Sequence, residues 1–310
     1  MGAEVADLRG NLKKFFGFDS FKGMQEEVIS TIMKGEDCFV IMPTGAGKSL
    51  CYQLPALVKG GVSLVVSPLI ALMDDQVAAL KLAGQSAEAI HSGKSREENV
   101  DNWLRVARGE VSLLYLSPER LMTPRMQAAL SKLNVGLIAI DEAHCISQWG
   151  HDFRPDYLRI GKVLRELNPP RVLACTATAT PPVRAEILEK LALHDAHVVL
   201  SGFARPNLHL DAVPVDSATD RRARRRVALR QALGSPQKIE GAAIVYAATR
   251  KQTEKVATML AGEGWTCAPY HAGLGATERH ETNRKFATGE LDIVVATNAF
   301  GMGIDRADIR

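Results

Sequence analysis

Short apolar runs that are rich in β-branched residues alternate with segments of helical periodicity along most of this sequence. Such alternation is typical of βαβ units, in which each helix returns the chain so that the next strand lies parallel to the last. The sequence therefore predicts an α/β fold with mainly parallel sheets. The strands expected in the first part are 38–42, 64–66, 113–116, 137–140 and 172–174.

A polar stretch at residues 203–220, which contains Pro and Asp, interrupts this pattern. After it a second series begins, with strands expected at 243–246, 268–270 and 293–296 and helices at 250–262 and 276–288. The length of 310 residues suits about two globular domains. We therefore predict a first domain at 1–207, a linker at 208–220 and a second domain at 221–310.

Two Ser/Thr-Pro pairs predict where helices begin. Ser67 can cap a helix that Pro68 starts, because the fixed φ of proline suits the first helical position. One face of this helix, which we expect to end at Gly84, would then carry Leu69, Leu72, Met73, Val77 and Leu80. Thr180 with Pro181 repeats the same start signal.

The composition argues against several other classes of protein. With 46% apolar and 24% charged residues, the chain is an ordinary globular one rather than a disordered or collagen-like one. No apolar run reaches the roughly 18 residues of a membrane span, and the N-terminus lacks the pattern of a secretory signal. We therefore expect a cytoplasmic protein with no membrane partner, associated with the nucleoid if its source is bacterial. Five scattered cysteines predict reduced, mostly buried thiols without a zinc site.

Charge is unevenly distributed within a small net excess of +3. Residues 221–230 contain six arginines. Such a block is either a solvated helix face or mobile segment, or a surface that holds phosphates.

A glycine-rich turn that ends in lysine and serine, MPTGAGKS at 42–49, follows the first expected strand. Between a strand and a helix, Gly45 and Gly47 allow backbone N–H groups to converge on phosphate oxygens, Lys48 reaches the outer phosphates, and Ser49 ligates Mg²⁺. The first position of the general pattern is Met42 rather than Gly, so an incidental glycine-rich turn is the alternative.

Two acidic residues, Asp141 and Glu142, end the strand expected at 137–140. Asp141 can hold the Mg²⁺ shell while Glu142 orients and deprotonates the attacking water. Acidic pairs at strand ends also occur as solvated turns. Together with the glycine-rich turn upstream, the pair predicts a nucleotide-hydrolysing site that works mainly by positioning and charge neutralisation.

The motifs in this order resemble those of the RecQ family of superfamily 2 DNA helicases over essentially the whole chain. HCISQWGHDFRPDY is the most specific segment, because it resembles the aromatic-rich loop that couples DNA to ATP in RecQ enzymes. The resemblance implies two RecA-like domains, the cofactors ATP and Mg²⁺, and unwinding of DNA with 3′ to 5′ polarity in repair and recombination. The matching segments are FGFDSFKGMQ (16–25), MPTGAGKS (42–49), SPLIALMDDQV (67–77), DEAHCISQWGHDFRPDY (141–157), TATAT (176–180) and ATNAFGMGIDRADIR (296–310).

The resemblance also implies roles around ATP. Gln25 corresponds to the glutamine that reads the adenine edge, with Phe18 and Lys22 near the base, although many relatives have Arg in place of Lys22. Thr44 belongs to the phosphate loop, and Asp305 corresponds to a second-domain residue that faces ATP. His144 and Gln148 correspond to positions that relay between ATP and DNA, and residues 176–178 to the coupling motif between domains.

For the nucleic acid, the resemblance implies a phosphodiester track over both domains and partners that are single-stranded or partly duplex DNA. Trp149, Phe153 and Arg154 can stack on unpaired bases. Alternatively, Trp149 and Phe153 only close the domain interface. We expect binding that is salt-sensitive and tolerant of sequence. The implied contact residues are Ser67, Pro68, Gln76, Gln148, Trp149, Phe153, Arg154, Arg205, Asn207, Tyr246, Arg250, His271, Gly273 and Thr297.

The sequence stops before the QxxGRAGR motif of the family, whose arginine completes the ATP site. Arg306 and Arg310 precede that position and do not take its role. We therefore expect a truncated second domain with an unfinished sheet edge, weak hydrolysis, and a longer parent with single-strand-binding or repair proteins as partners. An RNA-directed superfamily 2 helicase and a non-catalytic ATP- and DNA-binding fragment are the alternatives.

Overall fold

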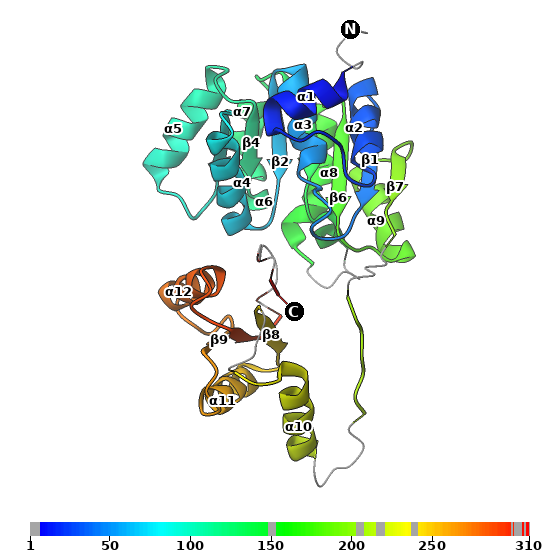
Figure 1. The fold of residues 1–310 in the computed structure, drawn as a ribbon. Helices are drawn as coiled ribbons and strands as arrows, with labels where there is room; N and C mark the ends of the chain where they lie inside the picture. Colours follow the sequence, from blue (N-terminus) through cyan, green and yellow to red (C-terminus); the bar gives the residue numbers. More distant parts are fainter. Residues whose placement is uncertain are drawn as a thin grey trace. The chain divides into compact units, whose positions relative to one another are not determined.

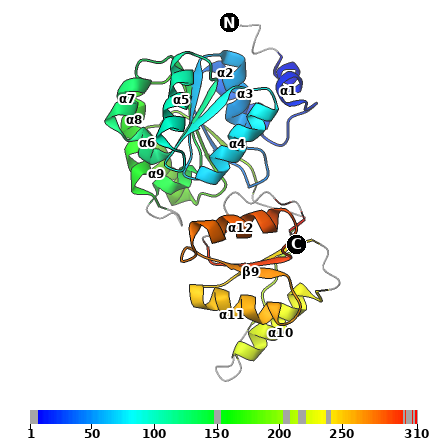
Figure 2. The ribbon, with the colours of Figure 1, turned by 90° about the vertical axis from the view of Figure 1, so that its left-hand side faces the viewer.

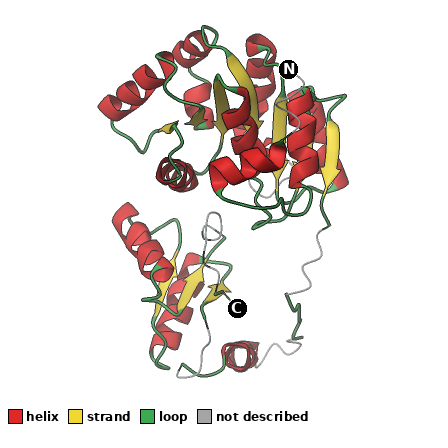
Figure 3. Cartoon of the chain, turned by 45° about the horizontal axis from the view of Figure 1, so that its top comes forward, coloured by secondary structure: helices red, strands yellow, loops and turns green. Residues whose placement is uncertain are grey.

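The structure, a computed structural model, divides into two compact units, Met1–Arg205 and Pro206–Arg310. It describes residues 7–147, 153–202, 208–214, 221–236, 241–298, 300, 306 and 308–309. Each unit is a parallel sheet covered by helices (Figure 3), as the alternating sequence pattern predicts.

Within the described residues, the sheet of unit 1 has seven strands, all parallel, in the order β3-β4-β2-β5-β6-β1-β7. Both faces are apolar, so β1 to β6 are almost continuously buried, as is usual for parallel sheets, whereas the edge strand β7 is mostly exposed. The strands are β1 Cys38–Ile41, β2 Val62–Val66, β3 Ala87–Ile90, β4 Leu113–Leu116, β5 Val135–Ile140, β6 Val172–Thr176 and β7 His197–Leu200.

The helices of unit 1 form a layer on each face of its sheet (Figures 1 and 2). One core lies under α1 to α4, and the other under α5 to α9. Successive side chains of β2 point to opposite faces of the sheet and so contribute to both cores. Leu64 and Val66 belong to one core, and Val65 belongs to the other. The helices are α1 Leu8–Phe16, α2 Gln25–Lys34, α3 Leu50–Lys59, α4 Ile70–Leu82, α5 Arg96–Ala107, α6 Pro118–Leu121, α7 Pro124–Leu130, α8 Ile160–Leu167 and α9 Pro181–Leu191, with 3₁₀ turns Ala143–Ile146 and Pro155–Arg159.

Two strands, β3 and β7, have no counterpart among the predicted ones. β3 reads AEAI, with a single β-branched residue and a buried carboxylate at Glu88, which Lys81 and Arg105 neutralise. β7 reads HVVL and lies at the sheet edge with three exposed residues, so it lacks a continuous apolar signal. Tertiary pairing therefore overrides a weak local preference at both places.

The predicted start of the helix after β2 is wrong. α4 begins at Ile70, and Leu69 is its N-cap residue. Ser67 cannot cap because its side chain is buried and its hydroxyl donates to Asp141 Oδ2 at 3.4 Å. The other predicted start is confirmed, since α9 begins at Pro181 with Thr180 as N-cap.

Unit 2 has a parallel sheet in the order β8-β10-β9, and these three strands match the predicted ranges closely. At the free edge of β8, Ala242 makes an isolated parallel bridge with Ile309. The elements are α10 Arg221–Leu233, β8 Ala243–Tyr246, α11 Arg250–Ala261, β9 Cys267–Tyr270, α12 Ala276–Ala287 and β10 Ile293–Ala296.

The arginine-rich block forms α10, which favours a helix over a mobile segment, and the side chains of 223–227 are exposed, as they would be in both a solvated helix face and a surface that holds phosphates. Arg226 and Arg230 both donate to Glu263, and these hydrogen bonds hold the pKa of the Glu263 carboxyl below its ordinary value. Of the five cysteines, four are buried free thiols and Cys267 is half-buried.

In the part of the chain that the structure describes, no helix is both long enough and apolar enough to cross a membrane.

Candidate nucleotide and nucleic-acid site

The glycine-rich turn joins β1 to α3, as predicted. Gly45 and Gly47 have φ of 82° and 75°, a left-handed region in which residues with a side chain are strained. Lys48 Nζ donates to the carbonyl of Met42 at 3.1 Å, and Ser49 is the N-cap residue of α3. A helix N-terminus, with its backbone N–H groups, and a lysine cation therefore meet in this turn, which suits an anionic ligand.

A cavity of about 400 Å³ joins this turn to the segment before α2. Gln25 lines this cavity, and its amide connects the two segments. Its Nε2 donates to the carbonyls of Ala46 and Gly47, both at 3.1 Å, and its Oε1 accepts from the Lys22 N–H at 2.8 Å. The Phe18 ring is 55% exposed, and it lies parallel to Phe16. The structure thus brings together residues predicted to hold the base and residues predicted to hold the phosphates.

Gly47 is required here for a second reason besides its backbone angle. A Cβ atom at this position would lie 2.4 Å from Gln25 Nε2. The glycine therefore permits the close approach of the Gln25 amide to the turn. Thr44 lies exposed in the same turn.

Asp141 follows β5 and is 7% exposed. Burial, followed by the neighbouring Glu142 carboxylate, raises the pKa of Asp141 to about 6, and the charge of Lys48 opposes this rise. Only β6 separates β5 from β1 in the sheet, so the carboxyl ends of these strands meet at one edge. The Lys48 ammonium and the Asp141 carboxyl therefore belong to one site, in which the charge of Lys48 acts on Asp141.

His144 links the acidic pair to the turn after β6. Its Nδ1 lies 2.9 Å from Thr176 Oγ1 and 3.2 Å from Glu142 Oε2. The Thr176 hydroxyl donates to the Thr178 carbonyl at 3.1 Å, so its oxygen accepts from His144, and we assign the proton to Nδ1 on this basis. Glu142 has a left-handed φ of 48°, which turns the chain sharply at the strand end.

Four predicted DNA contacts of unit 1, namely Ser67, Pro68, Gln76 and Arg154, make hydrogen bonds within the protein. Ser67 faces Asp141 and not the solvent. The Pro68 carbonyl accepts from Arg154 Nη1 at 3.0 Å, and Gln76 Oε1 accepts from Gln53 Nε2 at 2.8 Å. The backbone after β2 is therefore tied to the segment that carries Phe153 and Arg154, and α4 is tied to α3.

The five predicted contacts of unit 2 that the structure describes gather at the carboxyl edge of its sheet. Tyr246 ends β8, His271 follows β9, and Thr297 follows β10. A Cβ atom on Gly273 would lie 3.1 Å from Arg250 Nη1 and 3.2 Å from His271 Nδ1. His271 is 3% exposed; its Nε2 lies 3.3 Å from Glu254 Oε1 without the geometry of a hydrogen bond.

Five predicted site residues lie outside the described residues: Gln148, Trp149, Arg205, Asn207 and Asp305.

Two supporting residues were not found from the sequence. Tyr157 is fully buried, and its hydroxyl donates to the Asp141 carbonyl at 3.0 Å. Gln53 donates to Gln76 and to the Tyr115 hydroxyl. The sequence carried a signal only for Gln53. This residue follows Ser49 of the phosphate loop by four residues, so the two lie on the same face of the helix.

Comparisons with known proteins agree with this arrangement. Residues 22–187 match the DEAD/DEAH box helicase family, and residues 224–310 match the helicase conserved C-terminal domain. The chain is 40% identical to the probable ATP-dependent DNA helicase RecS of Bacillus subtilis over 99% of its own length and 60% of the relative. It is 41% identical to the ATP-dependent DNA helicase RecQ of the same organism over 96% of its length, which is 49% of that relative. The chain therefore spans only part of these relatives, and the resemblance to RecQ helicases is confirmed.

Solved structures with a similar fold include Mycobacterium smegmatis helicase Lhr bound to ssDNA and AMP-PNP, with a TM-score of 0.67 and 19% identity over 99% of this chain and 43% of Lhr. The DUF1998 helicase MrfA bound to DNA has a TM-score of 0.69 and 19% identity over 98% of this chain and 46% of MrfA. At such identities the likeness concerns the fold, and it confirms the predicted RecA-like α/β architecture.

Proposed function

Since this chain belongs to the DEAD/DEAH box helicase family, we propose that it is the motor part of a RecQ-type DNA helicase, which couples ATP hydrolysis to 3′ to 5′ movement along single-stranded DNA. The observation that carries the proposal is that Lys48 and Asp141 share one site at the carboxyl edge of the sheet, beside the cavity lined by Phe18 and Gln25. DNA repair and recombination are the processes in which such a motor would act.

The residues present fit a magnesium nucleotide. Asp141 is a buried carboxylate whose ionised form is disfavoured by desolvation and by Glu142, so a divalent cation would stabilise it. Ser49 and Asp141 would hold the Mg²⁺, which neutralises charge on the phosphates. Gly45, Gly47 and Lys48 would cradle those phosphates.

In this mechanism, Glu142 orients the attacking water and accepts its proton. The His144 Nδ1–H lies within reach of Glu142 Oε2 and so holds this carboxylate in place. Because the same ring nitrogen contacts Thr176, movement of the turn after β6 would alter the position of Glu142. Gln25 and Phe18 would bind the adenine, while Asp305 would approach the nucleotide from the second domain.

For DNA, we propose that Phe153, Arg154 and the neighbouring Trp149 and Gln148 sense unpaired bases. The hydrogen bond from Arg154 to the Pro68 carbonyl supports a role in the same track as Pro68. Single-strand-binding or repair proteins are the proposed protein partners, and the cytoplasm or nucleoid is the proposed location. The remaining proposed contacts are Ser67, Gln76, Arg205, Asn207, Tyr246, Arg250, His271, Gly273 and Thr297.

Steady-state ATP hydrolysis tests the proposal. We expect Mg²⁺-dependent turnover that single-stranded DNA stimulates more than RNA does, and we expect Lys48→Ala to abolish it while the circular dichroism spectrum stays unchanged. Greater stimulation by RNA would favour an RNA-directed helicase. ATP and DNA binding without turnover would identify a non-catalytic fragment, and turnover retained in Lys48→Ala would reject the nucleotide site.

A further inference from the structure

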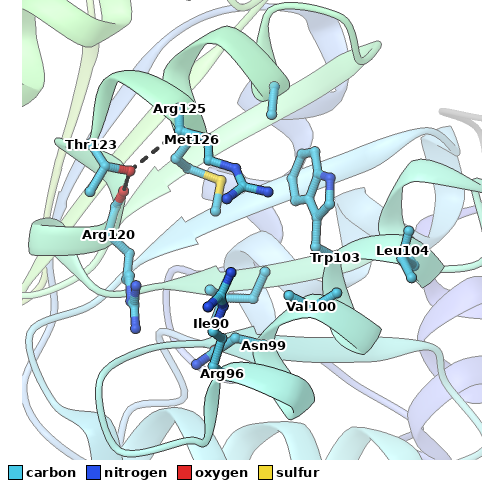
Figure 4. Close-up of a pocket in the computed structure, with 11 residues that line it drawn as sticks. Ile90, Arg96, Asn99, Val100, Trp103, Leu104, Arg120, Thr123, Arg125 and Met126 are labelled. Carbon is cyan, nitrogen blue, oxygen red and sulfur yellow. Dashed lines mark hydrogen bonds between the residues drawn. The ribbon is translucent and has the colours of Figure 1, made fainter.

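A second and larger cavity, of about 650 Å³, lies in unit 1 between α5 and the segment α6–α7. From α5 come Arg96, Val100 and Trp103, whose spacing of three to four residues places them on one face of the helix. From α7 come Arg125 and Met126. Figure 4 shows these side chains around one hollow. None of them belongs to the nucleotide site described above.

Three arginines line this cavity without a partner. The guanidinium groups of Arg96, Arg120 and Arg125 make no hydrogen bond or ion pair with any residue that the structure describes, and the lining contains no Asp or Glu. Elsewhere on α5 and at its end, by contrast, Arg105 and Arg108 pair with carboxylates. Unneutralised guanidinium groups gathered in one hollow favour an anionic ligand.

Apart from the three arginines, Asn99 and Thr123, the lining is apolar, and part of it is accessible. Val100 and Leu104 are 43% and 49% exposed, and the Trp103 indole is half-buried against the core. Flat apolar surface next to cations suits a ligand that alternates flat rings with negative charges. Single-stranded nucleic acid has this chemistry.

The position of the cavity favours DNA over an acidic peptide. Backbone hydrogen bonds connect the carboxyl ends of four neighbouring strands: Asp141 N–H donates to Val66, Ser67 N–H to Leu116, and Ser117 N–H to Ile90. Ile90 lines the cavity, and Asp141 belongs to the nucleotide site. The cavity therefore continues the same sheet edge past Ser67, where the DNA track was expected.

We propose that this cavity is a subsite for single-stranded DNA, in which one base stacks on Trp103 and the flanking phosphates bind Arg96 and Arg125. This inference rests on the proposed function and extends its DNA track along the edge formed by β2, β4 and β3. Because the contacts are to a ring face and to phosphates, the subsite binds without regard to sequence.

Fluorescence anisotropy of a labelled 20-nucleotide oligothymidylate, with the whole 310-residue chain, tests the subsite. Trp103→Ala should weaken binding about tenfold, and Trp103→Phe should keep most of the affinity, because a phenyl ring still stacks. Arg96→Ala and Arg125→Ala should each lower the slope of log affinity against log salt by about 0.7. The matched control is Arg108→Ala, which removes the same charge beside the same helix from a residue paired with Glu110.

Three outcomes separate the proposals. The subsite is supported if Trp103→Ala weakens binding, Arg96→Ala and Arg125→Ala lower the salt slope, and Arg108→Ala binds with the affinity and salt slope of the wild type. Circular dichroism must show that all variants are folded. If the wild type binds the oligonucleotide and Trp103→Ala, Arg96→Ala and Arg125→Ala all behave like Arg108→Ala, the subsite is refuted while the proposed function stands, and an acidic peptide becomes the better occupant. If the wild type itself does not bind, both proposals are refuted together.

Discussion

The Nδ1 atom of His144 lies 2.9 Å from the hydroxyl oxygen of Thr176, although the two residues belong to different strand-end turns. The same nitrogen lies 3.2 Å from Glu142 Oε2. One ring therefore touches both the proposed general base and the turn that leads into α9. Through this contact, a change near residues 176–178 could reach the hydrolysing groups directly.

We predict that Thr176→Val reduces the stimulation of ATP hydrolysis by single-stranded DNA about tenfold, because the His144 Nδ1–H loses the hydroxyl that links it to the turn after β6, while Glu142 Oε2 stays within its reach. Thr176→Ser keeps the hydroxyl and should behave like the wild type. The measurement is the ratio of DNA-stimulated to basal turnover. An equal fall in both rates would show that the contact is structural and carries no coupling.

Gly47→Ala should weaken binding of a fluorescent ATP analogue at least tenfold, because the new methyl group meets Gln25 Nε2 and the left-handed backbone costs about 1–2 kcal/mol. Gly60→Ala is the matched control: Gly60 also has a positive φ, of 70°, but no atom lies near its Cβ position. The control should lose stability and retain nucleotide affinity. Equal affinities for the two variants would contradict the close approach at Gly47.

The titration of Asp141 predicts a pH dependence of stability. Its pKa in the folded chain, about 6, lies above the ordinary value of 3.8, so the folded state holds the proton more tightly than the unfolded state. The favourable contribution is complete below about pH 4 and is lost as the pH rises through about 6. Asp141→Asn does not titrate, so without Mg²⁺ it should become more stable than the wild type by about 1–3 kcal/mol at pH 7.5.

Denaturant unfolding at a series of pH values measures this difference, and the tryptophan fluorescence of both proteins reports the transition. The gap between variant and wild type should open between about pH 4 and pH 6. A gap that is constant across this range would mean that Asp141 does not titrate as inferred.

Glu88 is a buried carboxylate, 3% exposed, that pairs with Lys81 at 2.9 Å and with Arg105. Glu88→Gln removes the charge that both cations face, and we expect it to destabilise the chain by about 3 kcal/mol. Glu110→Gln is the control, because Glu110 pairs with Arg105 and Arg108 at the surface and should cost less than about 1 kcal/mol. Thermal unfolding compares the two; similar shifts in Tm would contradict the buried role of Glu88.

Local patterns were sufficient for most of the architecture. The apolar runs that became β1, β2, β4, β5 and β6 stand out because each is buried on both faces of a parallel sheet. The glycine-rich turn could also be predicted from the sequence. Gly45 and Gly47 have positive φ angles, which glycine adopts without strain. β3 was not predicted because it contains Glu88, a charged residue that interrupts the apolar pattern. This carboxylate can be buried only because Lys81 of α4 and Arg105 of α5 pair with it.

Sequence by itself thus determined most of the strands along the chain, the phosphate-binding turn and the acidic pair, because each depends on neighbours within a few residues; β3 and β7 were not among those strands. Only the tertiary structure decided that Ser67 turns inward to Asp141, that His144 meets Thr176, and that the arginines of α5 and α7 share one cavity. These contacts join segments from different strands and helices. Which of them meet depends on strand order in the parallel sheet, and no local periodicity encodes that order.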